Sequence, residues 1–390
     1  MIIKKVKAKK IRNSRGEETI KIQVKSDKGK GEASAPSGAS KGKYEAKDYV
    51  LKIDECIKFI NDCKELEGLE INNFDDLKKI ESIVNKTNLG ANPTIALEYA
   101  VLKCLGSVWK TIDKDTRQIS KPLGNVIGGG KHIKNENHCE FQEFLLLPFN
   151  SKNFSEAMNA NKLAHELVKK KLKKMKLKVE MTDEGAWAPN LKIEEILDLL
   201  KEVVSEVQDE TKIELKIGID VAANSFFDGK NYIYRDKKLN PEKQVEYISE
   251  LIEKYKLHYI EDPLMEEDFK GFAKLNNKFG TKCMITGDDL TVTNMERLKL
   301  ALKNKSINSM IIKPNQNGSL ISTKEVIEEA NKNKLYLIIS HRSGETNDAT
   351  ISHLAIGFKI PIIKCGIFGE EREVKLKEII KIENQIKYNN

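Results

Sequence analysis

Hydrophobic and polar positions alternate along the first 50 residues, a pattern that predicts β-strands. The segment 19–24 follows a period of two and leads into a turn at 26–29. Between about 50 and 110, apolar residues instead recur with the 3.6-residue period of helices, and Asn92-Pro93 is typical of a helix start. We therefore expect an N-terminal α+β domain over residues 1–117, with the polar segment 113–117 as its linker.

The pattern changes after residue 118, where short apolar runs each end at a polar or charged residue. Six runs end, at intervals of 23 to 41 residues, near Asp220, Glu261, Asp288, Lys313, His341 and Lys364. Each interval accommodates a strand, a loop, a helix and a return, so the runs predict successive β/α units of a parallel sheet. An open doubly wound sheet would bring two or three of these residues together, whereas a barrel gathers all six at one mouth. The series favours the α/β class, with a (β/α)8-type barrel over residues 118–390.

Composition limits the classes of function. The chain has 390 residues, 39% hydrophobic and 32% charged, as in folded globular proteins. No apolar run approaches 18 residues and the N-terminus lacks a signal-peptide core, so we expect a cytoplasmic protein without a membrane span. The six cysteines are scattered without a CxxC pair, which favours reduced thiols. The net charge of +8 rests on lysine, with seven arginines in the chain, so we do not expect nucleic acid as a partner.

Carboxylates and lysines at the strand ends suggest a chemistry. Asp220, Glu261 and Asp288 would repel one another strongly without a cation between them, and oxygen ligands of this kind suit Mg²⁺. The alternative is that each is an acid of a surface loop. Lys313 and Lys364 end apolar strands near other cations, so we expect lowered pKa values and a base among them. A lysine in a salt bridge with a metal-site carboxylate is an equally good interpretation of either one alone.

Eleven longer motifs then occur in order along the chain: PSGASKGKYEA (36–46), LGAN (89–92), GGGKH (128–132), FQEF (141–144), DEGAWAPN (183–190), GIDVAANSFF (218–227), IEDP (260–263), GDDLTVTN (287–294), KPNQNGS (313–319), SHRSGET (340–346) and IKCG (363–366). In these motifs the sequence resembles the enolase family over nearly its whole length. The resemblance implies a C-terminal barrel of the enolase kind with an N-terminal α+β capping domain. It also implies phosphopyruvate hydratase activity, the reversible dehydration of 2-phospho-D-glycerate to phosphoenolpyruvate in glycolysis and gluconeogenesis.

The resemblance further implies how the site divides its work. Two Mg²⁺ ions would bind per active site, the first at Asp220, Glu261 and Asp288, and the second, arriving with the substrate, at Ser40. They would stabilise the second negative charge that forms on the substrate carboxylate when its C2 proton leaves. Lys313 would be the base, and Lys364 would lie against the substrate carboxylate. Glu184, aided by Glu143, would be the acid that protonates the leaving hydroxyl. Arg342 and Ser343 would bind the phosphate, and His132 and His341 would line the pocket.

Several positions depart from the family pattern. The usual DEGGFAP is DEGAWAP here, with Trp187, and the usual KVNQ is KPNQ, with Pro314 directly after the expected base. The segment after Lys364 is one residue shorter, and the family's ion pair between subunits falls on Lys21 and near Gly369. We still expect a homodimer or a higher homo-oligomer that acts on a small phosphorylated hydroxy acid.

Two alternatives remain open from the sequence. An enolase-like paralogue would keep the two metal sites but act on a related phosphorylated hydroxy acid. The substitutions described above are the reason for considering it. A non-catalytic binding or scaffold protein is the other, suggested by the lysine-rich segment 169–178. That segment also suits the exposed C-terminal end of a helix, where lysine complements the helix dipole.

Overall fold

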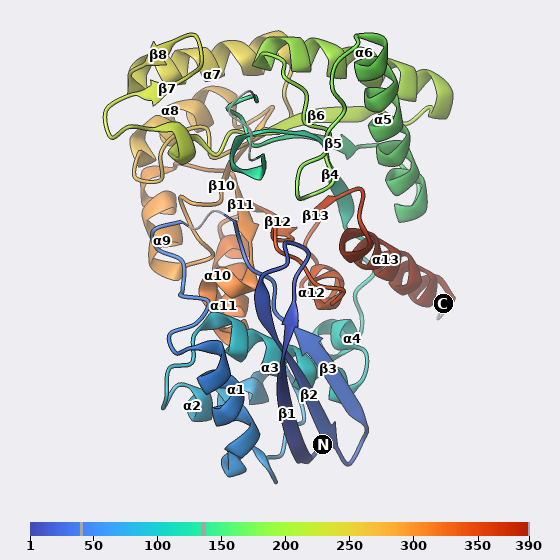
Figure 1. The fold of residues 1–390 in the computed structure, drawn as a ribbon, viewed down its shortest axis with the longest axis vertical. Coiled ribbons are helices and arrows are strands. Elements are labelled where there is room, and N and C mark those ends of the chain that lie inside the picture. The colour runs from blue at the N-terminus through green and yellow to red at the C-terminus, as the bar shows by residue number, and fades with distance from the viewer. Residues whose placement is uncertain (40–41, 134–137, 389–390) are drawn as a thin grey trace.

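The computed structural model describes residues 1–39, 42–133 and 138–388, and places an N-terminal α+β domain beside a closed barrel (Figure 1). The N-terminal domain contains an antiparallel sheet of three strands, β1 (Ile3–Arg12), β2 (Glu18–Ser26) and β3 (Lys30–Ser34). The period-two pattern of β2 is confirmed, since Ile20, Ile22 and Val24 are fully buried. The turn between β2 and β3 lies where the sequence predicts it.

Helices cover one face of this sheet (Figure 1). They are α1 (Ile53–Asp62), η1 (Lys64–Leu66), η2 (Phe74–Asp76), α2 (Leu77–Val84), α3 (Ala91–Leu105) and α4 (Val108–Asp113). Nearly every residue of α3 is buried, because this helix packs against both the sheet and the barrel. Gly31 on β3 permits the close approach, since a Cβ atom there would lie 2.0 Å from the carbonyl oxygen of Ala100.

Eight strands close the barrel in the order β10-β11-β12-β13-β4-β5-β6-β9. They are β4 (Lys121–Gly128), β5 (Glu143–Pro148), β6 (Leu215–Asp220), β9 (Tyr259–Glu261), β10 (Met284–Gly287), β11 (Ser309–Ile312), β12 (Tyr336–Ser340) and β13 (Ile362–Gly366). The predicted α/β barrel is thus confirmed, and the six predicted runs are its parallel strands from β6 to β13. The sequence pattern did not predict the antiparallel course of β5 between β4 and β6.

An outer layer of helices surrounds the strands (Figure 1). It comprises α5 (Phe154–Lys174), α6 (Ile193–Thr211), α7 (Pro241–Tyr255), α8 (Phe269–Phe279), α9 (Met295–Asn304), α10 (Pro314–Asn317), α11 (Leu320–Lys332), α12 (Thr350–Gly357) and α13 (Glu370–Tyr388), with η3 (Gly130–His132), η4 (Ala223–Phe226) and a small sheet of β7 (Tyr232–Ile233) and β8 (Lys238–Leu239) in the loops. Alternate strand residues fill the barrel interior, which holds an apolar cluster of Leu123, Leu145, Leu147, Tyr259, Met284, Ile311, Ile338 and Ile362.

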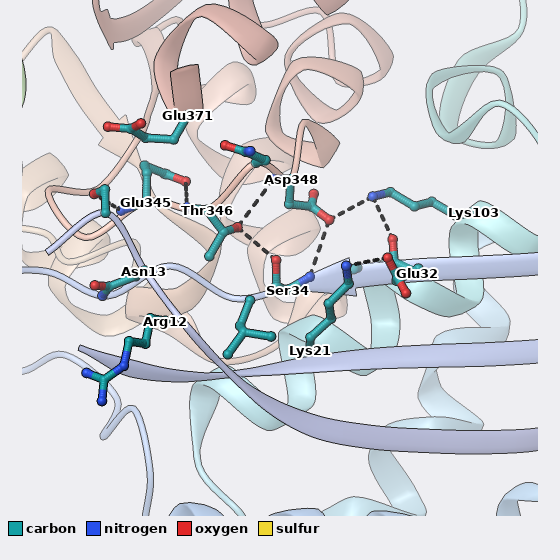
Figure 2. A pocket seen from close by; sticks show the side chains of 14 residues that line it. Arg12, Asn13, Lys21, Glu32, Ser34, Lys103, Glu345, Thr346, Asp348 and Glu371 are labelled. Atoms are coloured by element: carbon teal, nitrogen blue, oxygen red, sulfur yellow. Dashed lines mark hydrogen bonds and ion pairs between the residues drawn. The ribbon is translucent and has the colours of Figure 1, made fainter. Parts of the chain in front are cut away.

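The two domains meet along a polar seam. Lys103 on α3 pairs with Asp348 of the barrel at 2.7 Å, and Ser34 donates its hydroxyl to Thr346 or accepts from it at 2.8 Å. These residues border an open hollow of about 440 Å³ between β2, β3 and the barrel (Figure 2). Lys21, which lines the same hollow, pairs with Glu32 of its own sheet (Figure 2). The seam therefore joins the N-terminal domain to the barrel through a partly buried ion pair and a hydrogen bond.

Three sequence expectations concern the rest of the described chain. All six cysteines are free thiols, and five of them are buried. Among the described residues, no helix has both the length and the apolar character needed to cross a membrane. The lysine-rich segment begins on the last turns of α5, where Lys171 pairs with Glu202 at 2.8 Å and Glu206 at 2.6 Å on α6. Part of this segment therefore serves to join two neighbouring helices.

Candidate active site

Three carboxylates lie at the ends of three adjacent strands. Asp220 ends β6, Glu261 ends β9, and Asp288 directly follows β10. Asp220 and Glu261 are register partners, and Glu261 pairs in turn with Thr286, two residues before Asp288. All three are at most 9% exposed. The barrel thus brings together, at one mouth, groups that lie up to 68 residues apart in the sequence.

The antiparallel strand adds a fourth carboxylate to the same mouth. Glu143 is the first residue of β5, and its register partner on β6 is Asp220. A parallel strand would have placed its last residue here, so the reversed direction of β5 explains why an acid at a strand start reaches the site. Glu143, Asp220 and Glu261 have carboxylate oxygens within 4.8 Å of one another.

Lys364 on β13 lies across the mouth and contacts all three of these acids. Its ammonium nitrogen is 2.8 Å from Asp220 Oδ2 and 2.6 Å from Glu261 Oε2, and it also pairs with Glu143. Burial opposes its charge, but Asp220 and Glu143 raise the pKa of Lys364 well above its usual value. The same holds for Lys313 after β11, where burial is outweighed by the paired Asp288, which raises the pKa of Lys313. Our expectation of lowered pKa values was therefore wrong for this arrangement, because the carboxylates next to each amine outweigh burial and the nearby cations.

The acids themselves differ in ionisation. Burial, followed by the charge of Asp220, raises the pKa of Glu261 to about 8. Burial also raises the pKa of Glu143 well above its usual value. Glu184 is equally buried, yet the charges of His132 and His341 hold its pKa well below the usual range. The pKa values of Glu143 and Glu184 are therefore shifted in opposite directions. Glu184, with Glu143, is the expected acid, and its two histidine neighbours are the cause of its lowered pKa.

Two histidines hold Glu184 in place. His132 Nε2 lies 3.7 Å from one carboxylate oxygen of Glu184, and His341 Nε2 lies 3.5 Å from the other. The other ring nitrogen of His132, Nδ1, lies 2.7 Å from Asp183. Burial opposes the charged form of His132, but Glu184 and Asp183 raise its pKa, whereas burial lowers the pKa of His341. The pKa values of the two rings are therefore shifted in opposite directions.

Arg342 anchors the loop that comes from the N-terminal domain. Its guanidinium group donates to Glu45 at 3.0 Å and to Asn315 at 2.9 Å, and is 4% exposed. The hydroxyl of the adjacent Ser343 accepts a hydrogen bond from the backbone of Ala39 at 2.6 Å. Arg342 and Ser343 thus face the segment that precedes Ser40. Ser40 itself lies outside the described residues.

One pocket contains most of the predicted residues. Its lining includes ten of them: Glu184, Lys313, Glu143, His341, His132, Lys364, Arg342, Ser343, Asp220 and Asp288. Glu261 lies behind Lys364 and is fully buried. Its Oε1 atom has no hydrogen-bond partner among the described residues, so a buried carboxylate oxygen is available to a cation. The donor set of buried oxygens therefore fits Mg²⁺.

Sequence reasoning missed several supporting residues. Gln316 donates to Asp288 at 2.9 Å and to Glu45 at 3.2 Å, so it links the barrel acid to the N-terminal loop. Asp262 accepts from the backbone amides of Asp288 and Asp289 at 2.9 Å and 2.7 Å, which fixes the turn after β10. All lie inside the motifs PSGASKGKYEA, IEDP, GDDLTVTN and KPNQNGS, so the motifs contained the signal without separating supporting residues from reacting ones.

The departures from the family pattern lie outside the pocket lining. Trp187 donates from Nε1 to the carbonyl of His165 at 2.8 Å, and its ring stacks on the His165 ring at 4.8 Å. Pro314 is the first residue of α10, where a helix needs no backbone donor. Neither residue is among those that line the pocket.

Comparison with known proteins agrees with this architecture. Residues 3–110 match the family model described as the enolase N-terminal domain, and residues 117–390 match the enolase C-terminal TIM barrel domain. Three curated relatives, each named enolase, come from Archaeoglobus fulgidus (38% identical; 98% of this chain and 97% of the relative), Methanosphaera stadtmanae (40%; 99% and 97%) and Methanocorpusculum labreanum (40%; 96% and 96%).

Proposed function

Since this chain belongs to the enolase family and is a lyase, a phosphopyruvate hydratase, we propose that it dehydrates 2-phospho-D-glycerate by Mg²⁺-dependent proton abstraction. The observation that carries the proposal is the meeting of Lys313, Lys364 and the carboxylates of four strands at one mouth. Removal of the C2 proton places a second negative charge on the substrate carboxylate. The site concentrates cations where that charge forms, which stabilises the transition state more than the ground state.

We propose that Asp220, Glu261 and Asp288 hold the first Mg²⁺, and that Ser40 contributes to a second that arrives with the substrate. When bound, these ions supply electrostatic stabilisation of the aci-carboxylate. The support is the adjacency of the three strand ends and the unpartnered Oε1 of Glu261. Lys364, already held among three acids, then provides a fixed positive charge beside the substrate carboxylate.

Lys313 is the proposed base. It has to be neutral to accept the C2 proton, and its contact with Asp288 opposes this. The positive charges of Arg342 and Lys364 act the other way and lower its pKa. If Asp288 instead bound another ligand, its charge would no longer raise the pKa of Lys313. The cations Arg342 and Lys364 would then lower that pKa. The backbone amide of Lys313 donates to Thr293 at 2.9 Å, which fixes the start of its side chain.

The proposed acid is the hydrogen-bonded pair of Glu143 and Glu184. Burial raises the pKa of Glu143, and Glu184 is the member that the two histidines orient. Asn125 donates to Glu143 at 2.8 Å and lies 3.4 Å from Glu184, so it aligns both carboxyl groups. The pair can thus release one proton to a leaving hydroxyl group while the buried site excludes bulk water.

Arg342 and Ser343 are the proposed phosphate contacts. The planar guanidinium group of arginine suits a phosphate in two-point contact. Arg342 now binds the carboxylate of Glu45, so phosphate would take the place of that carboxylate. Binding of substrate would then change the contacts of the segment 36–46, to which Ser40 belongs.

A direct assay tests this proposal. Purified protein with 2-phosphoglycerate and Mg²⁺ should produce phosphoenolpyruvate, followed by its ultraviolet absorbance, and chelation of Mg²⁺ should abolish the signal. Lys313→Ala should remove turnover while calorimetry still detects Mg²⁺ binding. Lys303→Ala, which removes an exposed lysine of α9, is the matched control and should be fully active. Turnover by Lys313→Ala would overturn the base assignment.

Two organisational predictions accompany this function. We propose that residues 1–117 and 118–390 are the two domains, and that the protein is a homodimer or a higher homo-oligomer of the cytoplasm. The structure pairs Lys21 with Glu32 within the chain, so the family's ion pair between subunits would need a substitute here. Light scattering of the purified protein measures the oligomeric state.

A further inference from the structure

The end of the barrel opposite the active site, here called the basal end, carries a lysine beside every strand. Five of these lysines lie between the end of a helix and the start of the next strand: Lys212, Lys256, Lys305, Lys334 and Lys359. The other three are Lys121 at the start of β4, Lys152 after β5 and Lys282 before β10. Seven of the eight side chains are exposed, and Lys121 is half-buried. Because the eight strands close into a barrel, these basal lysines form a ring.

Local backbone requirements do not explain this choice of residue. The five that follow helices have left-handed backbones with φ between 51° and 62°. Glycine is the usual residue at such positions, and a residue with a Cβ atom pays about 1 kcal/mol of strain there. Helix dipoles favour lysine at a C-terminus, but Lys152 immediately precedes the N-cap of α5, where a cation is unfavourable. Helix stability alone therefore does not account for lysine at all of these positions.

The ring also lacks neutralising partners. Of its eight members, only Lys359 forms an ion pair within the described chain, with Asp113 at 2.6 Å. The basal segments 114–121, 149–152, 212–214, 256–258, 280–283, 305–308, 333–335 and 358–361 contain ten lysines and arginines against two acids. One of the two, Glu214, is already paired with Lys216 at 2.5 Å. The basal segments thus carry a net charge of +8, which equals the net charge of the whole chain.

Aromatic rings lie among these cations. Phe149, 46% exposed, has Lys121 and Lys216 over its ring at 5.2 Å and 5.4 Å, and His258 edge-on at 5.7 Å. Tyr336, at the start of β12, is 58% exposed. Next to His258 is a hollow of about 560 Å³, lined by Lys216, Lys256, Lys278, Lys282 and Phe279, and by Glu253, which pairs with Lys278 at 2.9 Å. Its size suits a small aromatic anion such as one nucleotide unit.

We propose that the basal lysines and the two exposed rings bind single-stranded nucleic acid without sequence preference. Lysines in a ring match a chain of phosphates, and aromatic faces stack on any base. Reading of duplex sequence would require arginine, and only seven of the 67 lysines and arginines in the chain are arginine. The sequence pointed instead to 169–178, but there Lys171 is paired with two glutamates.

Fluorescence anisotropy with a labelled 15-nucleotide oligouridylate tests the proposal. The same measurement with oligothymidylate of equal length shows whether the protein prefers RNA or DNA. Lys256→Asn/Lys305→Asn/Lys334→Asn removes three ring charges, and asparagine tolerates left-handed backbone, so this variant should fold. The matched control, Lys170→Gln/Lys173→Gln/Lys174→Gln, removes three exposed charges from α5.

We expect the basal variant to bind at least tenfold more weakly in 0.1 M salt. The slope of log K against log salt should shrink by about 2, at about 0.7 per lost phosphate contact. Tyr336→Ala should weaken binding about tenfold through lost stacking. Both triple variants should keep the wild-type rate of dehydration. Equal weakening by the control triple, no saturable binding at 50 mM salt, or binding to phosphatidylserine vesicles in place of the oligonucleotides would overturn the proposal.

Discussion

Lys364 Nζ lies 2.8 Å from Asp220 Oδ2, although the two residues are 144 positions apart in the sequence. Both side chains are 4% exposed, so water contributes little to either charge. Removing either group leaves its partner as a buried charge, which is costly. The stability of the barrel therefore depends on keeping both members of this ion pair.

Lys364→Met should make this coupling measurable. The variant leaves Asp220, Glu143 and Glu261 without their shared cation, so we expect a loss of about 3 to 5 kcal/mol in the free energy of unfolding without Mg²⁺. Urea denaturation in a chelating buffer measures it. Lys359→Met breaks a more exposed pair with Asp113 and should cost less than about 1 kcal/mol. Equal losses in the two variants would contradict the idea that burial dominates.

Isotope exchange should distinguish the role of the proposed acid from that of the proposed base. Glu184→Gln removes one member of the carboxyl pair proposed to deliver the proton to the leaving hydroxyl, so dehydration should slow by about 10² to 10⁴. Lys313 is intact in this variant, and the C2 hydrogen should still exchange with D₂O, as detected by proton NMR. Lys313→Ala should lose both exchange and dehydration. Loss of exchange in Glu184→Gln would show that Glu184 acts before or during proton abstraction.

Glu98 should make the stability of the protein depend on pH. This buried residue of α3 accepts a hydrogen bond from the backbone of Leu320 at 3.0 Å, and burial, with its neighbour Glu81, raises its pKa well above 4.5. A raised carboxyl pKa means that the folded state holds its proton longer, so stability falls as the pH rises above 4.5. Glu98→Gln keeps the acceptor and removes the titration. Its advantage over the wild type in thermal unfolding should therefore grow from pH 5 to pH 8, and a constant difference would refute this explanation.

Pro314→Val should leave catalysis nearly unchanged. Pro314 is the first residue of α10, and the turn is closed by Gln316, whose backbone donates to Lys313 at 2.9 Å. Valine restores a backbone donor that this position does not need, so kcat should change by less than about threefold. Stability should fall by about 0.4 to 1 kcal/mol, because valine gives the unfolded chain more freedom. A loss of kcat beyond tenfold would show that proline positions the base.

The sequence predicts the barrel mouth because chemistry and periodicity coincide there. Asp220, Glu261, Lys313 and Lys364 each end an uninterrupted apolar run, and parallel strands bring such ends together. Glu143 does not follow this rule, since it begins a strand. Its inclusion came from the FQEF motif, because strand direction leaves no trace in a short apolar run.

Protonation proved harder to predict than position. We expected Lys313 to be influenced mainly by cations, but the nearest group is Asp288. We expected the proton on Glu184, but His132 and His341 stabilise its charged form. A pKa depends on distances of a few ångströms between side chains from different strands, and sequence spacing does not specify such distances.

The pairing of β13 with β4 closes the barrel between segments about 240 residues apart. During synthesis β13 leaves the ribosome after all the other strands. Until then Glu143, Asp220 and Glu261 have no Lys364, and β4 and β12 are open edges. Long-range contacts of this kind form late, after the local hairpin of β4 and β5. Completion of the chain is therefore also completion of the active site, and a nascent fragment can neither close the barrel nor assemble the catalytic charges.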